Sequence, residues 1–286
     1  MSDAPMPETP QTPIDHPFDQ AIALLPGADG SWVGRTTPAY GNMVGPFGGI
    51  TAAVLLNAVL RHPQCQGEPL ALTVNYAGPV AEGAFAVQAR AGRTNRSSQH
   101  WLVEQVQGEP GSGAPACTTA SALLGTRRQT WSANEITCPE VPEAAVVARP
   151  LRLPRVAWMA NYDQRYVDGA FPDYAQGAAD QDSTSVLWVR DEPPRPLDFA
   201  SLAAICDVFF PRIFLRRRRY TPAGTVTSTT YFHVDGQALA AQGTRHVLAL
   251  ARAQRYGGGW FDQTAQVWGA DRTLLATSHQ LVYFKD

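Results

Sequence analysis

The sequence is organised around one stretch, FGGITAAVLLNAVLR, which runs from Phe47 to Arg61. It is apolar on nearly every side of the helix that it predicts, and a helix of that kind has to be buried. At about 1.5 Å per residue it is only about 20 Å long, too short to cross a bilayer comfortably. Gly48 and Gly49 at its start leave backbone N–H groups that could hold an anion. We therefore expect a core helix whose first turn can bind negative charge.

The composition is that of an ordinary soluble globular chain. It has 286 residues, 44% hydrophobic content and a formal net charge of −2, so a nucleic-acid partner is not expected. The four cysteines lie far apart and form no CxxC pair, which predicts neither a zinc ribbon nor a disulfide framework. Residues 1–17 lack the basic start and apolar run of a signal peptide, and we expect a disordered tail on a cytoplasmic protein with no membrane partner.

The segment after the core helix predicts a run of strands separated by hairpin loops. One helix followed by several strands favours an antiparallel sheet that wraps around the helix, and it argues against alternating strands and helices. The apolar-rich strand candidates are residues 70–76, 84–93, 100–107 and 116–124.

The same pattern begins again in the second part of the chain. A proline-rich connecting segment, 126–196, contains a strand candidate at 185–190. A second apolar helix is expected from Leu197 to Phe210, with Asp198 as its N-cap and Pro211 as its stop. Strand candidates follow at 225–234, 244–256, 260–268 and 274–284. The offset of about 155 residues indicates an internal duplication, with similar halves at 18–125 and 197–286.

Five short motifs can be compared with known families by their order and spacing. They are Phe47-Gly48-Gly49, the strand Ser185 to Arg190, Cys206-Asp207-Val208, Thr225 ahead of Tyr231-Phe232-His233, and Ala276 to Gln280. In order and spacing the chain resembles, over residues 30–284, the double hot-dog acyl-CoA thioesterases of the thioesterase II kind. The resemblance implies an α+β double hot-dog fold, an acyl-CoA substrate and no cofactor. It also implies that Asp207, Thr225 and Gln280 surround the water that attacks the thioester.

The residues themselves support these roles unequally. Asp207 would face the negative end of its own helix, which costs roughly 0.3–1 kcal/mol, so either a solvated surface position or a function has to explain it. Gln280 shares its strand parity with apolar residues and should be buried and hydrogen-bonded, to the site or to loop backbone. Regular alternation places Thr225 on the more polar face with Thr227, so a surface threonine is nearly as good an interpretation. Thr227 would replace it if the register were shifted.

Two further groups of residues have a functional and a structural interpretation. Gly48 and Gly49 could hold an oxyanion, or they could allow the helix to pack tightly. Arg217 and Arg218, within the run Arg216 to Arg219, could bind the phosphates of coenzyme A, or they could belong to a solvated loop. The histidines show no metal-binding spacing, and no GxSxG motif is present.

Two departures from the family pattern and two alternative functions remain. The first helix carries no acidic residue, and Asn57 is its only strongly polar side chain, so we expect at most one working site per chain. The segment between Asp207 and Thr225 is shorter and more basic than the family would suggest. A hot-dog enoyl-CoA hydratase or dehydratase would need a histidine beside Asp207, and a catalytically inactive acyl-binding protein would need none of these groups. Exposed sheet edges predict a homodimer or a higher homo-oligomer.

Overall fold

The computed structural model describes residues 16–27, 30–108, 113–150, 156–172, 174 and 182–285. Most of the tail predicted at residues 1–17 lies outside these ranges, but His16 caps helix α1 (Pro17–Ala21) and Pro17 is its first residue. No helix in the described part of the chain is long and apolar enough to span a membrane.

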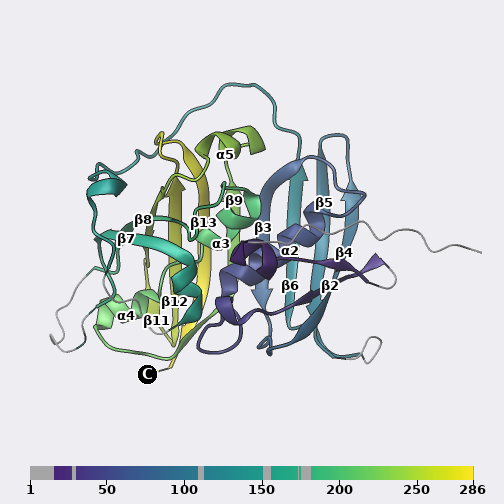
Figure 1. Ribbon diagram of the computed structural model, residues 1–286, viewed down its shortest axis with the longest axis horizontal. Helices are drawn as coiled ribbons and strands as arrows, with labels where there is room; N and C mark the ends of the chain where they lie inside the picture. Colours follow the sequence, from purple (N-terminus) through teal and green to yellow (C-terminus); the bar gives the residue numbers. More distant parts are fainter. Residues whose placement is uncertain are drawn as a thin grey trace, which may run out of the picture.

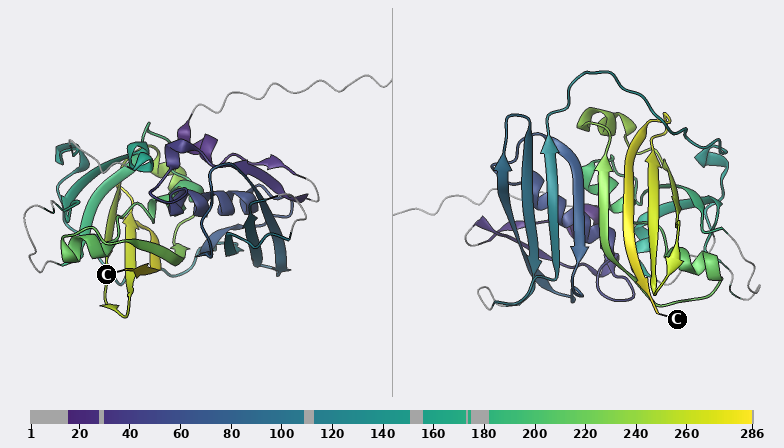
Figure 2. Two further views of the ribbon diagram at one scale, coloured as in Figure 1. Left: turned by 90° about the horizontal axis from the view of Figure 1, so that it is seen from below. Right: turned by 180° about the vertical axis from the view of Figure 1, so that it is seen from behind.

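The strands form one continuous sheet with the helices on one side of it (Figure 1). Seen from behind, the central strands lie side by side without a covering helix (Figure 2). The strand order is β1-β2-β4-β5-β6-β3-β9-β13-β12-β10-β8-β7, and β11 pairs with β12. The strands are β1 (Leu25–Pro26), β2 (Trp32–Arg35), β3 (Glu68–Tyr76), β4 (Ala84–Thr94), β5 (Ser98–Val106), β6 (Thr118–Gly125), β7 (Tyr162–Asp168), β8 (Ser185–Asp191), β9 (Ala223–Phe232), β10 (Val247–Arg252), β11 (Tyr256–Gly257), β12 (Trp260–Trp268) and β13 (Leu274–Phe284).

This order repeats itself from the middle of the sheet outward. From the junction of β3 and β9, the first half runs β3-β6-β5-β4-β2-β1 and the second runs β9-β13-β12-β10-β8-β7. At the junction the hydroxyls of Thr73 and Thr229 lie 3.0 Å apart, and these two residues are register partners. The duplication is therefore larger than the predicted helix and four strands, because two strands precede the helix in each half.

Helix α2 (Gly48–Leu60) is the expected core helix. Its residues are buried apart from Gly48, Asn57 and Leu60, which are partly buried. Helix α3 (Phe199–Ile205) packs against it, so the two halves share one core. The two helices thus fill the space that the curved sheet leaves on its inner face (Figure 2).

The second helix is capped as predicted but ends earlier than predicted. The carboxylate of Asp198 accepts a hydrogen bond from the N–H of Ser201, which is the expected N-cap. The helix stops at Ile205, well before Phe210, and Pro211 is the N-cap of a separate short helix, α4 (Arg212–Arg217). Two features were not predicted: α4 itself, and helix α5 (Gly236–Gln242), which lies between the strands expected at 225–234 and 244–256 and precedes β10.

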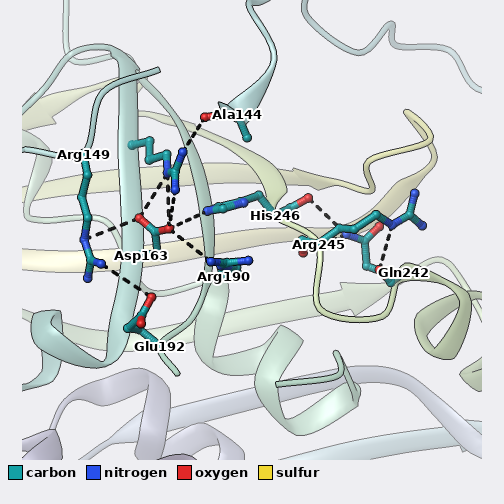
Figure 3. Close-up of polar contacts among 9 residues, drawn as sticks. Ala144, Arg149, Asp163, Arg190, Glu192, Gln242, Arg245 and His246 are labelled. Atoms are coloured by element: carbon teal, nitrogen blue, oxygen red, sulfur yellow. Dashed lines mark hydrogen bonds and ion pairs between the residues drawn. The ribbon is translucent and has the colours of Figure 1, made fainter. Parts of the chain in front are cut away.

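A buried ion cluster ties the connecting segment to the second half (Figure 3). At its centre is the carboxylate of Asp163 on β7, whose side chain is 2% exposed. Arg165 and His246 lie 2.9 and 3.0 Å from this carboxylate, and Arg149 and Arg190 lie 3.6 and 3.7 Å from it. The cluster joins the connecting segment, β7, β8 and the residue before β10 through a single side chain.

Candidate active site

Asp207 lies just beyond α3 and reaches the start of α2. Its backbone N–H donates to the carbonyl of Ala204, so the residue closes the last turn of its own helix. Its carboxylate is also hydrogen-bonded by the backbone of Gly49. The predicted unfavourable contact with the negative end of α3 is offset, because the carboxylate faces the positive end of α2. The second half therefore provides the side chain, and the first half provides the helix N-terminus.

Gln280 holds the carboxylate from the sheet side. Its Nε2 donates to Oδ1 of Asp207 at 2.8 Å, and the residue is 5% exposed. The predictions of a buried amide on the inner face of β13 and of a partner for it are thus both confirmed. Gln280 leaves the second carboxylate oxygen, Oδ2, for other contacts.

Thr225 completes a chain of hydrogen bonds to Asp207. Its Oγ1 donates to Oε1 of Gln280 at 3.3 Å. The predicted placement of Thr225 on the polar face with Thr227 is wrong, because β9 contains one extra residue between the partners of Leu281 and Val282. This bulge turns Thr225 to the inner face, where it pairs with Val282. Thr227 pairs instead with Leu281, which is 41% exposed on the opposite face.

Burial sets the ionisation of Asp207. Desolvation raises the pKa of its carboxyl to about 7, and the hydrogen bonds from Gln280 and Gly49 limit the rise. A carboxyl group with such a pKa is available both as carboxylate and as carboxylic acid near neutral pH. It can therefore accept a proton and return it within one turnover.

The two glycines at the start of α2 have different roles. A Cβ on Gly48 would lie 2.7 Å from Oδ2 of Asp207, so the absence of a side chain there gives the carboxylate its space. A Cβ on Gly49 would lie 2.6 Å from the carbonyl oxygen of Ala204 and 2.5 Å from the ring of Phe47. Gly49 is thus needed for tight packing and Gly48 for the space of the Asp207 carboxylate, and oxyanion binding at these residues stays a prediction.

Tyr76, at the end of β3, is a site residue that the sequence did not reveal. Its hydroxyl donates to the carbonyl of Gly48 at 3.0 Å and is also hydrogen-bonded with Ser228 of β9. Burial, and then the charge of Asp207, raises the pKa of Tyr76, so the phenol stays neutral. The only signal that could have found it is the pairing of β3 with β9, which brings Tyr76 to the junction.

In the described part of the first half there is no equivalent set of groups. Because Thr73 pairs with Thr229 at the junction, Leu72 corresponds to Ser228, and its partner Ala122 corresponds to Gln280. The amide of Asn57, the polar residue of α2, donates to the carbonyl of Ile22 at 2.8 Å and so holds the N-terminal segment. This arrangement agrees with one site per chain.

The two arginines predicted to bind coenzyme A differ in position. Arg217 is the last residue of α4 and lines a cavity together with Arg216. Arg218 follows the helix in the left-handed conformation, with φ of 47°, and is not part of that lining. The interpretation of the four arginines as a solvated loop is thus wrong for Arg216 and Arg217, which belong to helix α4. Among the described residues, no three or more His, Cys, Asp or Glu side chains are grouped to hold a metal ion.

The sequence matches the acyl-CoA thioesterase N-terminal domain over residues 37–125 and the acyl-CoA thioesterase C-terminal domain over residues 137–284. The chain belongs to the acyl-CoA thioesterase family. The resemblance that the sequence motifs indicated is confirmed, and membership of this thioesterase family supports thioesterase activity in general. No curated protein gives a significant match to the sequence.

Solved structures confirm the double hot-dog fold of this thioesterase-family chain. A hot-dog-fold protein of unknown function from Alicyclobacillus acidocaldarius is 44% identical, with a TM-score of 0.88 over 96% of this chain and 99% of that one. The acyl-CoA thioesterase II TesB2 from Mycobacterium marinum is 15% identical, with a TM-score of 0.72 over 94% and 98%. The tesB protein from Mycobacterium avium subs paratuberculosis is 16% identical, with a TM-score of 0.70 over 94% and 98%.

Proposed function

We propose that the protein hydrolyses acyl-CoA thioesters by direct attack of water, with Asp207 as the general base. The observation that carries the proposal is the carboxyl group of Asp207, with a pKa of about 7, held by Gln280 at the N-terminus of α2. A general base works best when its pKa lies near the working pH. The family membership of the chain supplies the thioester as the substrate class.

In the first step, a water molecule attacks the thioester carbonyl carbon. Oδ2 of Asp207 accepts the proton of this water, since Oδ1 already accepts the hydrogen bond from Gln280. Thr225 holds the amide of Gln280 from the other side, which fixes the direction of the carboxylate and of the water that it activates.

The carbonyl oxygen becomes negatively charged during the attack. We assign its stabilisation to backbone N–H groups in the first turn of α2 other than that of Gly49, which already donates to Asp207. The hydroxyl of Tyr76 fixes the carbonyl of Gly48 and so holds this turn in place. In the second step the C–S bond breaks, and the departing thiolate takes the proton from Asp207. The products are a free acid and a thiol.

The geometry favours hydrolysis over the hydratase alternative. A hydratase would use a histidine beside Asp207, but among the described residues no histidine hydrogen-bonds to it. His279 is next to Gln280 in sequence, but its side chain lies on the other face of β13. Its Nε2 is 3.4 Å from Oδ2 of Asp262. A catalytically inactive acyl-binding protein is the alternative that an activity measurement has to exclude.

The test is thiol release from a panel of short, medium, long and aromatic acyl-CoAs. Native protein is compared with Asp207→Asn and with Asp271→Asn, a matched control at an exposed turn whose hydrogen bond from the N–H of Thr273 an asparagine can keep. We expect release by the native and control proteins and its loss in Asp207→Asn, with acyl-CoA binding retained. Equal release by all three would remove Asp207 from the mechanism. Binding without release by any of them would support the inactive acyl-binding protein.

A further inference from the structure

The second half contains a cavity of about 410 Å³ between α4, β11 and the end of β13. Its lining consists of Ile213, Arg216, Arg217, Tyr256, Gly257 and Phe284. Small-molecule sites in proteins commonly have volumes of about 300–1,000 Å³. None of these residues contributes to the hydrogen-bonded group around Asp207, so the cavity needs an explanation of its own.

A buried positive charge lies next to this cavity. Arg212 is 0% exposed, and its guanidinium donates to the carbonyls of Phe210 and Ser183 and to the hydroxyl of Ser185, at 2.6–3.1 Å. Among the described residues, no carboxylate pairs with it. Burial lowers the pKa of Arg212 to about 10, so it still carries its charge at neutral pH. A buried cation of this kind favours an anion nearby.

Two arginines of α4, Arg216 and Arg217, line the cavity, and the buried Arg212 begins the same helix. Arg212 and Arg216 are four residues apart, the spacing that makes side chains neighbours on a helix surface. The charges of Arg212 and Arg216 both act on the hydroxyl of Tyr256, which joins the buried arginine to the lining. Guanidinium groups in such numbers are suited to phosphate.

Two other lining residues, Tyr256 and Phe284, are aromatic. The ring of Tyr256 stacks on Phe261 with centroids 5.4 Å apart, and Phe284 packs against the same phenylalanine at 6.2 Å. Aromatic rings of this kind bind the flat face of a nucleic-acid base by stacking. Phosphate recognition beside aromatic rings is the chemistry that a nucleotide requires.

The position of the cavity agrees with a ligand that also reaches Asp207. Gln280, Val282 and Phe284 share one face of β13, since β13 pairs with β12 without interruption in this stretch. Phe284 is four residues from Gln280, or about 14 Å at roughly 3.4 Å per residue. In coenzyme A a long pantetheine arm separates the thioester from the phosphorylated adenosine, so the two ends of one substrate could occupy the two sites.

We propose that this cavity binds the 3′-phosphorylated adenosine diphosphate of coenzyme A, with Arg216 and Arg217 on the phosphates and Tyr256 and Phe284 beside the base. The proposal rests on the proposed function, because it assigns the remote part of the same substrate. It predicts that the site recognises the nucleotide even when no thioester is present.

Two measurements test this assignment. The first is calorimetric binding of adenosine 3′,5′-bisphosphate, which requires no hydrolysis. The second compares kcat/KM for an acyl-CoA with that for the S-acyl-pantetheine of the same acyl group. The variants are the double substitution Arg216→Gln with Arg217→Gln, and Arg219→Gln as a control from the same run that lies outside the lining.

We expect the native and control proteins to bind the bisphosphate and the double variant to bind it at least tenfold more weakly. For acyl-CoA, the double variant should lose about ten- to a hundredfold in kcat/KM, while acyl-pantetheine hydrolysis stays unchanged and shows that the protein is folded. Equal bisphosphate binding by all three proteins, or equal losses on both substrates, would overturn the assignment. If neither thioester is hydrolysed, the proposed function fails, and bisphosphate binding alone decides the assignment of the cavity.

Discussion

Gly48 and Asp207 come from different halves of the chain, yet a Cβ on Gly48 would lie 2.7 Å from Oδ2 of Asp207. The side chain of the second half therefore occupies space that the first half leaves empty. We expect Gly48→Ala to displace the carboxylate and to lower kcat/KM about a hundredfold, since a shift of about 1 Å at a catalytic group can cost that much. Steady-state kinetics on an acyl-CoA substrate would measure this.

Gly49→Ala should have a different effect. Its Cβ would meet the carbonyl of Ala204 and the ring of Phe47, both fixed by packing. We expect the free energy of unfolding to fall by roughly 1–3 kcal/mol, as measured by denaturant titration. If Gly48→Ala destabilised the protein as much as Gly49→Ala and left kcat/KM intact, the separate roles of the two glycines would be refuted.

The pH dependence of hydrolysis should report Asp207. Only the ionised carboxylate can accept a proton, so kcat/KM should rise with pH and be half-maximal near pH 7, the pKa that burial gives this group. Gln280→Leu removes a hydrogen bond that favours the ionised form. The pKa should then rise, and the half-maximal point should move to more alkaline pH. A profile measured from about pH 5 to about pH 9 checks both statements, and an unmoved midpoint in the variant would contradict the second.

Thr225 and Thr227 offer a matched pair. Thr225→Val removes the hydrogen bond to Gln280 and should lower kcat/KM about three- to tenfold. Thr227→Val alters the opposite face of the same strand and should change it by less than about twofold. The same assay serves both variants, and the reverse order of effects would show that the bulge in β9 has been misplaced.

The cluster around Asp163 should matter for stability rather than for catalysis. Burial alone would raise the pKa of Asp163, but the hydrogen bonds and charges of Arg165 and His246 outweigh it and hold the pKa below its usual range. The stabilisation is therefore fully present above the unfolded pKa of about 3.9 and is lost as the pH falls through the lower folded value.

We expect Asp163→Asn to cost about 1–3 kcal/mol of unfolding free energy at neutral pH, because the partly exposed Arg165 and the less exposed His246 lose their charged hydrogen-bond partner. Glu140→Gln breaks an exposed ion pair with Arg272 and should cost less than about 1 kcal/mol. Thermal unfolding at neutral and acidic pH compares the two. Similar small losses in both variants would show that the cluster contributes little.

The sequence predicted those parts of the fold and the site that depend on regular local patterns. The all-round apolar character of α2 identified the core helix, and strand parity placed Gln280 on the inner face. The resemblance correctly implied that Thr225 lies beside Gln280, but strand parity put it on the wrong face, because a single extra residue in β9 reverses the parity and leaves no mark in composition. Tyr76 was missed because its role depends on the pairing of β3 with β9, a contact between strands about 150 residues apart.

The sequence also predicted a repeat that is too short, because some strands lack a clear local pattern. Strand β1 has two residues, and β7 lies in a proline-rich stretch that resembles a loop, so neither shows the alternation of a longer strand. The short helix α4 was not predicted, because it ends in a run of arginines and a run of like charges is typical of a solvated loop.

The two halves that meet at the junction of β3 and β9 contribute different kinds of groups to the site. One half contributes main-chain groups at the start of α2, which the hydroxyl of Tyr76 holds in place, and the other contributes the side chains of Asp207 and Gln280. At the start of α2, the residues need only be small enough to leave room for the carboxylate. Around Asp207, the residues also have to keep their functional groups. A duplicated chain can thus vary its first half, and with it the shape of the space around the substrate, while the second half keeps the reaction itself unchanged.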